Sequence, residues 1–418
     1  MDVHEHDVLV LGGGIHGVGV LHDLASRGMS RIALLERDVV GSGTSSRSTK
    51  LIHGGLRYLK RISQFGMVRE SLRERQILLR NAPDLVQPLQ CYIPVAAQGG
   101  TPQWMVKIGI YLYEYLAGSA SLGAPGHCRG SIVKNVLPYV RIHDDEIVQS
   151  FWDGQTDDVG LTIRVATSAE NLGGEIYEGM NVKKLSSTAQ GWEVDVVDVY
   201  GAKSKWKAPI VINALGPWAN TLLEHSGISP THDGVLNKGV HLVFPDLGLK
   251  GAVLLESHID QRLFFLLPWQ GQTLVGTTEQ VEDVSPDELC VDQDSVDYLL
   301  SSLQPWLSCE WTQKDIIHEF AGWRWLAVEK GQSATKTSRE WTLGELPGEK
   351  GPCWTIYGGK LTSYRKLCER IGDRVVEKRG GGSPSQTALA HCWAKAGEFR
   401  SPLPSLSHRF DVGVKKSS

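Results

Sequence analysis

The sequence predicts an α/β fold in which a domain built on a parallel sheet is joined to an inserted domain built on an antiparallel sheet. The first domain is indicated by residues 8–36, which read as strand, glycine turn, helix and strand. It is also indicated by two later strands followed by glycine turns, in INALGPW and IYGGKLTSYR. The second domain is indicated by residues 235–278, where apolar and polar residues alternate, as in QTLVGTTE.

The composition is that of an ordinary globular protein. Its 418 residues, of which 41% are hydrophobic, suffice for one large domain or two medium ones. The 43 basic and 47 acidic residues nearly balance, which argues against a nucleic-acid binder. Seven scattered cysteines without a C-x-x-C pair argue against a disulfide framework and against a metal site. With no signal-peptide pattern and no apolar run near the roughly 20 residues of a membrane span, a cytoplasmic protein is expected.

The glycine turn after the first strand has the spacing of a dinucleotide-binding fingerprint. Gly12, Gly14 and Gly17 form a G-x-G-x-x-G motif that allows a tight turn, close approach of a pyrophosphate and close packing of the next helix. Glu36 ends the following strand, where a carboxylate can accept hydrogen bonds from ribose hydroxyls. This acid also argues against the 2′-phosphate of NADP. The first domain is therefore predicted to be Rossmann-like.

The segments far from the fingerprint favour FAD over NAD. An NAD domain is normally self-contained, whereas an extended flavin needs contacts from distant strand-and-glycine turns such as those near Gly216 and Gly359. The helix after Gly358 and Gly359 would direct its N-terminus at the anionic N1/C2 edge of the flavin ring.

Several longer motifs give the chain its resemblance to a known family. It resembles the FAD-dependent glycerol-3-phosphate dehydrogenases, within the amino-acid-oxidase-like flavoproteins, from about Asp7 to Lys366. KLIHGGLRYL and GGKLTSYR are far more specific than the fingerprint. The motifs that carry the resemblance are DVLVLGGGIHGVG, TSSRSTKLIHGGLRYL, RERQILLRNAPDLVQP, WMVKIGIYLYEYLAG, INALGPWAN, KGVHLVFP, PWQGQTLVGTTE, AGWRWL, SREW and YGGKLTSYRKL.

The resemblance implies how the domains and the cofactor are arranged. The FAD domain is expected at residues 1–90, 150–225 and 345–380, and the substrate or cap domain at 91–149 and 226–344. A short C-terminal tail, residues 381–418, is expected in place of the family's helical domain. FAD is expected to bind non-covalently, with the loop of residues 44–50 wrapping the flavin. The expected cofactor contacts are Gly12, Gly14, Gly17, Glu36, Thr44, Ser45, Ser46, Lys50, Leu51, His53, Val182, Gly216, Gly359, Lys360, Leu361 and Thr362.

The implied reaction is oxidation of glycerol 3-phosphate at C2 to dihydroxyacetone phosphate, with hydride transfer to flavin N5 and quinone as the electron acceptor. Such chemistry needs a base for the hydroxyl, cations for a phosphate dianion and positive charge near the reduced flavin. His53 and His241 compete for the role of base and are left unranked. Lys360 is the candidate for the charge near the flavin.

The substrate phosphate is expected to meet Arg57, Arg324 and Arg339, with Tyr58 beside it near the reactive face of the flavin. Arg324 stands between Trp323 and Trp325, and we expect the two indoles to wall a dry phosphate site around its guanidinium.

The sequence is compatible with two environments for one apolar segment. Residues 104–117 are too short to span a membrane and unusually apolar for a solvated helix. They fit either ordinary core or a helix lying in a membrane interface, with tryptophan and tyrosine at the level of the headgroups. The second interpretation places the protein peripherally on the inner face of the cytoplasmic membrane.

The chain departs from the family pattern at several positions. The family usually has Asn, Thr, Pro and Asp where this chain has His16, Leu215, Trp325 and Glu279, and Arg47 enters a loop of small residues. Only about fifty residues follow Lys366, where the family usually carries a helical C-terminal domain, so the oligomeric state is not expected to transfer. Two alternatives stay open: a soluble oxidase that uses oxygen on a related hydroxy or amino substrate, and a flavin-binding protein without turnover.

Overall fold

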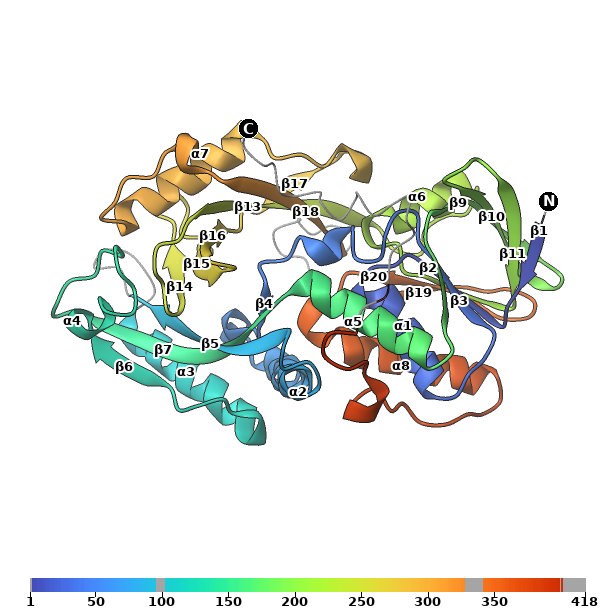
Figure 1. Ribbon diagram of the computed structural model, residues 1–418, viewed down its shortest axis with the longest axis horizontal. Coiled ribbons are helices and arrows are strands. Elements are labelled where there is room, and N and C mark those ends of the chain that lie inside the picture. The colour runs from blue at the N-terminus through green and yellow to red at the C-terminus, as the bar shows by residue number, and fades with distance from the viewer. Residues whose placement is uncertain (1, 95–101, 328–340, 399, 401–418) are drawn as a thin grey trace.

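The computed structural model describes residues 2–94, 102–327, 341–398 and 400. Figure 1 shows two lobes side by side, one holding a parallel sheet and the other a large antiparallel sheet that curls over helices α2 and α3. The helices of the described residues are α1 (Ile15–Ser26), α2 (Phe65–Asn81), α3 (Gln103–Ala117), α4 (Gly130–Val133), α5 (Asp158–Asn171), α6 (Ala219–His225), α7 (Gln293–Leu303) and α8 (Tyr364–Lys378).

The parallel sheet forms the centre of the first lobe. Its strand order is β19-β20-β12-β2-β3-β8, with every neighbouring pair parallel except β19 and β20. The strands are β19 (Thr342–Leu346), β20 (Cys353–Tyr357), β12 (Ile210–Asn213), β2 (Val8–Leu11), β3 (Ile32–Leu35) and β8 (Glu175–Tyr177). The sequence of strand, glycine turn, helix and strand predicted for residues 8–36 is confirmed as β2, α1 and β3.

Both faces of this sheet are buried, which explains why its strands are continuous apolar runs. Val8 and Val10 point into the core that α1, α5 and α8 cover, whereas Leu9 and Leu11 point into a second core on the opposite face. A smaller sheet closes that second core. Its strands are, in order, β1 (Asp2–Glu5), β11 (Lys203–Ala208), β10 (Gly191–Asp198) and β9 (Met180–Thr188).

The second lobe is built on the antiparallel sheet predicted from the alternating pattern. Its strand order is β17-β13-β16-β15-β14-β5-β7-β4, and β18 and β6 pair with β13 and β7. The strands are β17 (Gln280–Glu282), β13 (Gly234–Pro245), β16 (Gln272–Gly276), β15 (Leu263–Trp269), β14 (Ala252–Glu256), β5 (Val86–Ile93), β7 (Ile147–Thr156), β4 (Leu51–Ile52), β18 (His318–Ala327) and β6 (Gly126–Arg129). Because β4, at the sheet edge, continues the loop of residues 44–50, the two lobes meet at that loop.

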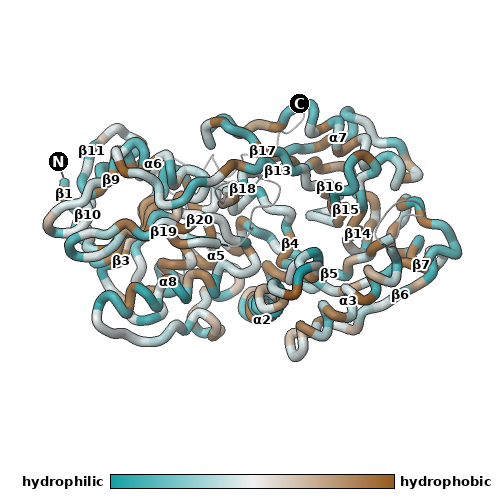
Figure 2. The backbone as a smooth tube through the Cα atoms, turned by 180° about the vertical axis from the view of Figure 1, so that it is seen from behind, coloured by the Kyte–Doolittle hydropathy of each residue, from teal (hydrophilic) through white to brown (hydrophobic). Residues whose placement is uncertain are grey.

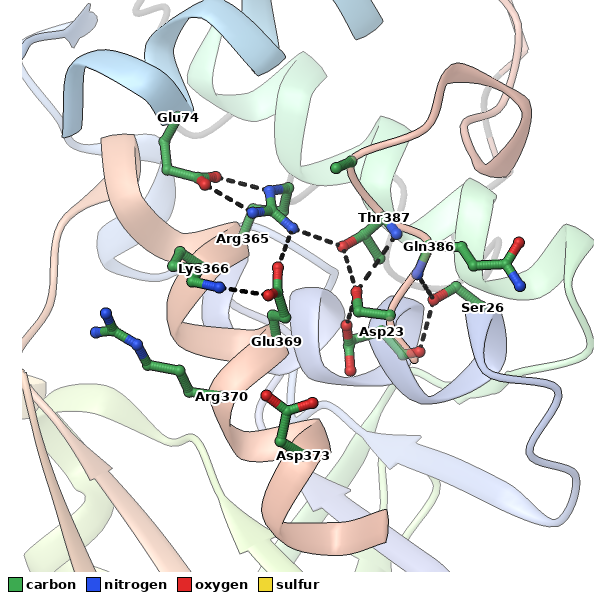
Figure 3. A network of polar contacts seen from close by, with 12 residues as sticks. Asp23, Ser26, Glu74, Arg365, Lys366, Glu369, Arg370, Asp373, Gln386 and Thr387 are labelled. Atoms are coloured by element: carbon green, nitrogen blue, oxygen red, sulfur yellow. Dashed lines mark hydrogen bonds and ion pairs between the residues drawn. The ribbon is translucent and has the colours of Figure 1, made fainter. Parts of the chain in front are cut away.

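The segment after α8, where a short C-terminal tail is expected, is tied to the first lobe. Ser385 Oγ donates a hydrogen bond to Asp23 Oδ1 at 2.5 Å, and the backbone N–H of Gln386 bonds to Ser26 Oγ (Figure 3). Further along, the imidazole of His22 lies 2.6 Å from the carbonyl oxygen of Cys392. Residues 385–392 therefore pack on α1.

The same polar network joins helices α2 and α8 to the segment around Thr387. The guanidinium of Arg365 on α8 bonds to both carboxylate oxygens of Glu74 on α2, at 2.6 and 2.7 Å. It also bonds to Glu369 at 2.6 Å and to Thr387 of the tail at 3.1 Å (Figure 3). Because Arg365 and Glu74 are both buried, this cluster fixes α2, α8 and the tail relative to one another.

Candidate active site at the junction of the two lobes

The fingerprint turn has the bare backbone that a pyrophosphate needs. Gly12 has φ +103°, and a Cβ placed there would lie 2.7 Å from the carbonyl oxygen of Ala214. A Cβ on Gly17 would lie 1.8 Å from the carbonyl oxygen of Gly12, so α1 can approach the turn only at a glycine. Gly14 caps α1, and the N–H of Ile15 donates to Ser45 Oγ at 2.8 Å. The N-terminus of α1 thus offers backbone donors suited to an anion.

Glu36 lies beside this turn, at the end of β3. Its Oε2 accepts a hydrogen bond from the backbone N–H of Gly13 at 2.6 Å, and its Oε1 accepts one from Asp38 at 2.8 Å. Burial raises the pKa of Glu36 to about 7. Val182 on β9, a further predicted contact, is half-buried against the core under β3.

The loop of residues 44–50 is held by a carboxylate that the sequence analysis missed. Asp158, at the start of α5, accepts hydrogen bonds from the ammonium of Lys50 at 2.8 and 2.9 Å and from the hydroxyl of Ser48 at 2.6 Å. Lys50 also donates to the carbonyl oxygen of Ser46 at 2.7 Å. Lys50, predicted as a cofactor contact, therefore directs its charge at Asp158 and shapes the loop from within.

The next residues are fixed from both lobes. The N–H of His53 donates to Thr362 Oγ1 at 3.0 Å, which links the loop to the turn before α8. The N–H of Gly54 donates to the hydroxyl of Tyr113 at 2.8 Å, and that hydroxyl donates to Asp153 at 2.8 Å. Asp153, also missed from the sequence, is buried and paired with Arg75 at 2.9 Å. Hydrogen bonds from both lobes thus hold the backbone of His53 and Gly54 in place.

Positive charge surrounds Tyr58, a few residues further on. The ammonium of Lys360 lies 3.9 Å from the centre of the Tyr58 ring, and the guanidinium carbon of Arg57 lies 5.3 Å from it. Arg57 also lies 3.6 Å from a carboxylate oxygen of Glu279. Burial, followed by the charges of Lys360, Arg57 and Arg324, lowers the pKa of His53 to about 3. At neutral pH the imidazole is therefore uncharged.

Arg324 belongs to the same site, but its surroundings differ from those predicted. Its guanidinium donates to Asn237 Oδ1 at 3.3 Å and to Thr277 Oγ1 at 3.1 Å. Trp323 and Trp325 point to the other face of β18, into an apolar cluster with Tyr357. The prediction of a tryptophan-walled phosphate site is therefore wrong, because successive side chains of a strand point to opposite faces.

Space for the Arg324 guanidinium comes from glycine instead. Gly239 faces Gly322 across the β13–β18 pair, and a Cβ on Gly239 would lie 2.7 Å from Nη2 of Arg324. Burial lowers the pKa of Arg324, and the nearby carboxylate of Glu279 opposes that effect. A partly buried guanidinium with only neutral hydrogen-bond acceptors is well suited to an anionic ligand.

His241 lies deeper than His53. Its Nε2 lies 2.9 Å from the hydroxyl oxygen of Thr49, and its ring stacks on Phe320 at a centroid distance of 4.8 Å. Burial, with Arg324 and Lys50 nearby, lowers its pKa well below the usual value. His241 therefore supports the loop of residues 44–50 from the cap sheet.

The remaining predicted residues that the structure describes also lie around this junction. Gly216 and Gly359 both have positive φ, of +57° and +100°, in the turns after β12 and β20. Arg339 lies outside the described residues. The other predicted contacts occupy the short helix that opens the loop of residues 44–50, strand β4 and the turn before α8, and they are Thr44, Ser45, Ser46, Leu51, Leu361 and Thr362.

Taken together, these residues fit FAD. The glycine cradle at the N-terminus of α1 and the partly buried Glu36 suit the adenosine and pyrophosphate of FAD, and the loop of residues 44–50 leads from that cradle to the cations around Tyr58. Fold and site thus define a flavoprotein oxidoreductase.

Comparison with known proteins agrees with this class. Residues 7–337 match the FAD dependent oxidoreductase family. The aerobic glycerol-3-phosphate dehydrogenase of Escherichia coli is 30% identical over 386 residues, covering 91% of this chain and 75% of that protein. The D-erythritol 1-phosphate dehydrogenase of Brucella abortus is 32% identical over 371 residues, covering 87% and 72%. The structure of glycerol-3-phosphate dehydrogenase from Bacillus halodurans complexed with FAD has a TM-score of 0.74 at 27% identity, covering 92% of this chain and 67% of that one.

The chain therefore belongs to the FAD-dependent oxidoreductase family and is related to its glycerol-3-phosphate dehydrogenases. The predicted amino-acid-oxidase-like fold and the predicted cofactor, FAD, are confirmed.

Proposed function

We propose that this protein oxidises sn-glycerol 3-phosphate to dihydroxyacetone phosphate. Bound FAD supplies the hydride acceptor for this reaction. The observation that carries the proposal is the group of Arg57, Arg324 and Lys360 that surrounds the neutral His53. A phosphate dianion is an anionic ligand that such a group of guanidinium and ammonium donors suits, because each donor can form a charge-assisted hydrogen bond to a phosphate oxygen.

Arg324 is the proposed main phosphate ligand. Its planar fork can donate two parallel hydrogen bonds to phosphate oxygens, and its present hydrogen-bond partners, Asn237 and Thr277, are neutral groups. Lys360, from the first lobe, and Arg57, from the segment after β4, add charge near Tyr58. The phosphate of the bound substrate would then contact cations from both lobes.

His53 is the proposed acceptor of the proton from the C2 hydroxyl. It is half-buried and lies among the three cations, whereas His241 is buried and already placed against Thr49. The bound phosphate would offset the cations that depress the pKa of His53, and its basicity would rise when substrate arrives. His241 is then a positioning residue for the loop of residues 44–50.

Quinone in a membrane is the proposed electron acceptor, reached through helix α3. Trp104, Ile108, Tyr111 and Tyr115 recur at helical spacing on one exposed face, and Trp104 and Tyr115 are 64% and 80% exposed. Figures 1 and 2 place α3 at the outer edge of the second lobe, and Lys107 on the same helix suits anionic headgroups. None of the helices formed by the described residues is long and apolar enough to cross a bilayer.

The test is anaerobic reduction of the bound flavin, followed by absorbance, with glycerol 3-phosphate, erythritol 1-phosphate and glycerol. Glycerol 3-phosphate should bleach the flavin, and glycerol should react poorly because it lacks the phosphate. Faster bleaching by erythritol 1-phosphate would move the proposal to the four-carbon polyol. Bleaching by neither phosphate, with dithionite still effective, would refute a phosphorylated polyol as substrate.

Arg324→Lys keeps the charge but loses the fork, and Arg324→Ala loses both. A charge-assisted hydrogen bond is worth about 1.5–3 kcal/mol, so kcat/KM for glycerol 3-phosphate should fall roughly 10- to 200-fold. The small kcat/KM for glycerol should hardly change. Arg129→Lys, at an exposed arginine of the same lobe, is the control and should leave both values unchanged. Equal losses on both substrates would show that Arg324 supports the fold instead.

A further inference from the structure

A buried tyrosine joins helix α3 to the turn that carries His53. Tyr113 is one of the buried residues of α3, and its hydroxyl accepts a hydrogen bond from the N–H of Gly54 at 2.8 Å. The same hydroxyl donates to Asp153 Oδ1 at 2.8 Å, and the N–H of Gly54 also donates to that oxygen at 3.2 Å. One hydroxyl therefore connects the peptide bond after His53 to a carboxylate on β7.

The carboxylate is itself held in place, so the hydroxyl has a fixed anchor. Arg75 on α2 is buried, and its Nη1 donates to Asp153 Oδ1 at 2.9 Å. The same guanidinium donates to the carbonyl oxygens of Trp152 at 2.8 Å and of Ala120 at 2.9 Å. Burial raises the pKa of Tyr113 well above its usual value, so the hydroxyl keeps its proton and donates it to the carboxylate.

The local chain is built so that the hydroxyl can reach the backbone. A Cβ on Gly54 would lie 2.5 Å from the hydroxyl oxygen of Tyr113 and 2.5 Å from Cδ2 of Leu72, so this approach requires a glycine. The preceding N–H, that of His53, donates to Thr362 Oγ1 at 3.0 Å. Two consecutive N–H groups are therefore bound from the two lobes, which fixes the Cα atom from which the imidazole extends.

We propose that Tyr113 is a positioning residue that orients His53 for proton transfer. The inference rests on the proposed role of His53 as the acceptor of the substrate proton. Proton transfer needs the donor and the acceptor within hydrogen-bond reach, and a displacement of about 1 Å can cost roughly 100-fold in rate. Without the hydroxyl, the N–H of Gly54 keeps only its longer hydrogen bond to Asp153. The turn is then held less tightly, and the imidazole is placed less precisely.

A second buried tyrosine of the same lobe provides a matched control. Tyr113→Phe removes the hydroxyl and keeps the ring, which packs edge-on against Phe151 with the ring centroids 5.7 Å apart. Tyr92 on β5 is also buried, and its hydroxyl donates to Gln90 Oε1 at 2.8 Å. Tyr92→Phe and Tyr113→Phe thus each remove one hydrogen-bonded hydroxyl from a buried ring, and both should lower the melting temperature. Only Tyr113→Phe should affect the turn at His53.

The first measurement is amide hydrogen exchange of the holoprotein, followed by mass spectrometry on peptides that cover residues 51–56. Tyr113→Phe should speed exchange in this segment severalfold, because the N–H of Gly54 loses its shorter hydrogen bond, and Tyr92→Phe should leave the exchange unchanged. This measurement needs no substrate, so it tests the hydrogen bond apart from the proposed reaction.

The second measurement is anaerobic reduction of the flavin in single turnovers, with glycerol 3-phosphate or erythritol 1-phosphate, whichever reacts faster. Tyr113→Phe should lower the limiting rate constant about 10- to 100-fold and raise the solvent isotope effect, because proton transfer becomes slower. The substrate dissociation constant should stay unchanged, because Arg324, the proposed main phosphate ligand, bonds elsewhere. Tyr92→Phe should reduce its flavin at the parental rate.

A double-mutant cycle with His53→Asn separates positioning from general loosening of the fold. His53→Asn should itself slow reduction strongly, and Tyr113→Phe should add little on that background, because the side chain that it positions is already gone. An equal loss on both backgrounds, an unchanged rate in Tyr113→Phe, or unchanged exchange of residues 51–56 would overturn the assignment. A parental rate in His53→Asn, or no reduction by either phosphate, would refute the proposed function and this inference with it, a result that the cycle distinguishes from failure of Tyr113 alone.

Discussion

Replacing Arg365 with methionine should destabilise the first lobe far more than an ordinary charge removal would. The side chains of Arg365 and Glu74 are only 5% and 4% exposed, and two short hydrogen bonds join them. Methionine fills much of the volume but leaves Glu74 as a buried carboxylate without its cation, and it also removes a bond to Glu369. Breaking a buried pair in this way costs about 3–5 kcal/mol of unfolding free energy.

The same two helices provide the control. Arg370 on α8 pairs with Glu70 on α2 at 2.5 Å, but these side chains are 43% and 30% exposed. An exposed pair is worth about 0–1 kcal/mol, so Arg370→Met should cost little. Urea unfolding of each variant, followed by circular dichroism at pH 7.5, compares the two costs directly.

Two further measurements locate the cause. Glu74→Gln combined with Arg365→Met removes both charges and should recover part of the lost stability, because the penalty comes from the unpaired carboxylate. Burial already raises the pKa of Glu74 while Arg365 opposes that rise. Without Arg365 the folded-state pKa should rise further, so the penalty should be full at high pH and shrink as the pH falls through that pKa. A loss in Arg365→Met no larger than that in Arg370→Met would refute the reasoning.

The remaining predictions concern the cofactor and the membrane. The apparent FAD Kd should rise about tenfold from pH 8 to pH 6, because FAD favours the ionised form of a Glu36 whose pKa is about 7, and Glu36→Gln should abolish this dependence in titrations of the stripped protein. Gly17→Ala should purify without FAD, because its Cβ would lie 1.8 Å from the carbonyl oxygen of Gly12, and stoichiometric FAD in that variant would contradict the fingerprint assignment. Binding to anionic vesicles in flotation assays should weaken with salt and fall severalfold in Trp104→Ser, whereas exposed Tyr200→Ser, far from α3, should bind normally.

Local patterns in the sequence predicted the parts of the site that a single segment encodes. The glycine spacing before α1 and the acid at Glu36 lie within one strand-helix-strand unit, so their roles follow from short-range geometry. Asp158 was missed because it meets Lys50 only through the fold, across 108 positions of sequence. Asp153 and Tyr113 were missed for the same reason.

The wrong prediction for the surroundings of Arg324 could have been corrected by a signal in the sequence. The prediction followed the neighbours of Arg324 along the chain, and the flanking tryptophans suggested a common pocket. A strand alternates its faces, so Trp323 and Trp325 must share one face while Arg324 takes the other. Assigning residues 318–327 to a strand would have separated both indoles from the guanidinium on the basis of the alternation alone.

The distribution of charge between the lobes connects the fold to the proposed chemistry. Lys360 comes from the first lobe, whereas Arg324 and Arg57, which follows strand β4 of the antiparallel sheet, come from the second, so the proposed phosphate site lies where the lobes meet. The loop of residues 44–50, fixed at that junction by Asp158, carries the chain on to His53. Burial, followed by these three charges, lowers the pKa of His53, and a bound anion that offsets the charges would raise its basicity. The cations would then make proton removal depend on phosphate binding, which explains why glycerol alone should be a poor substrate.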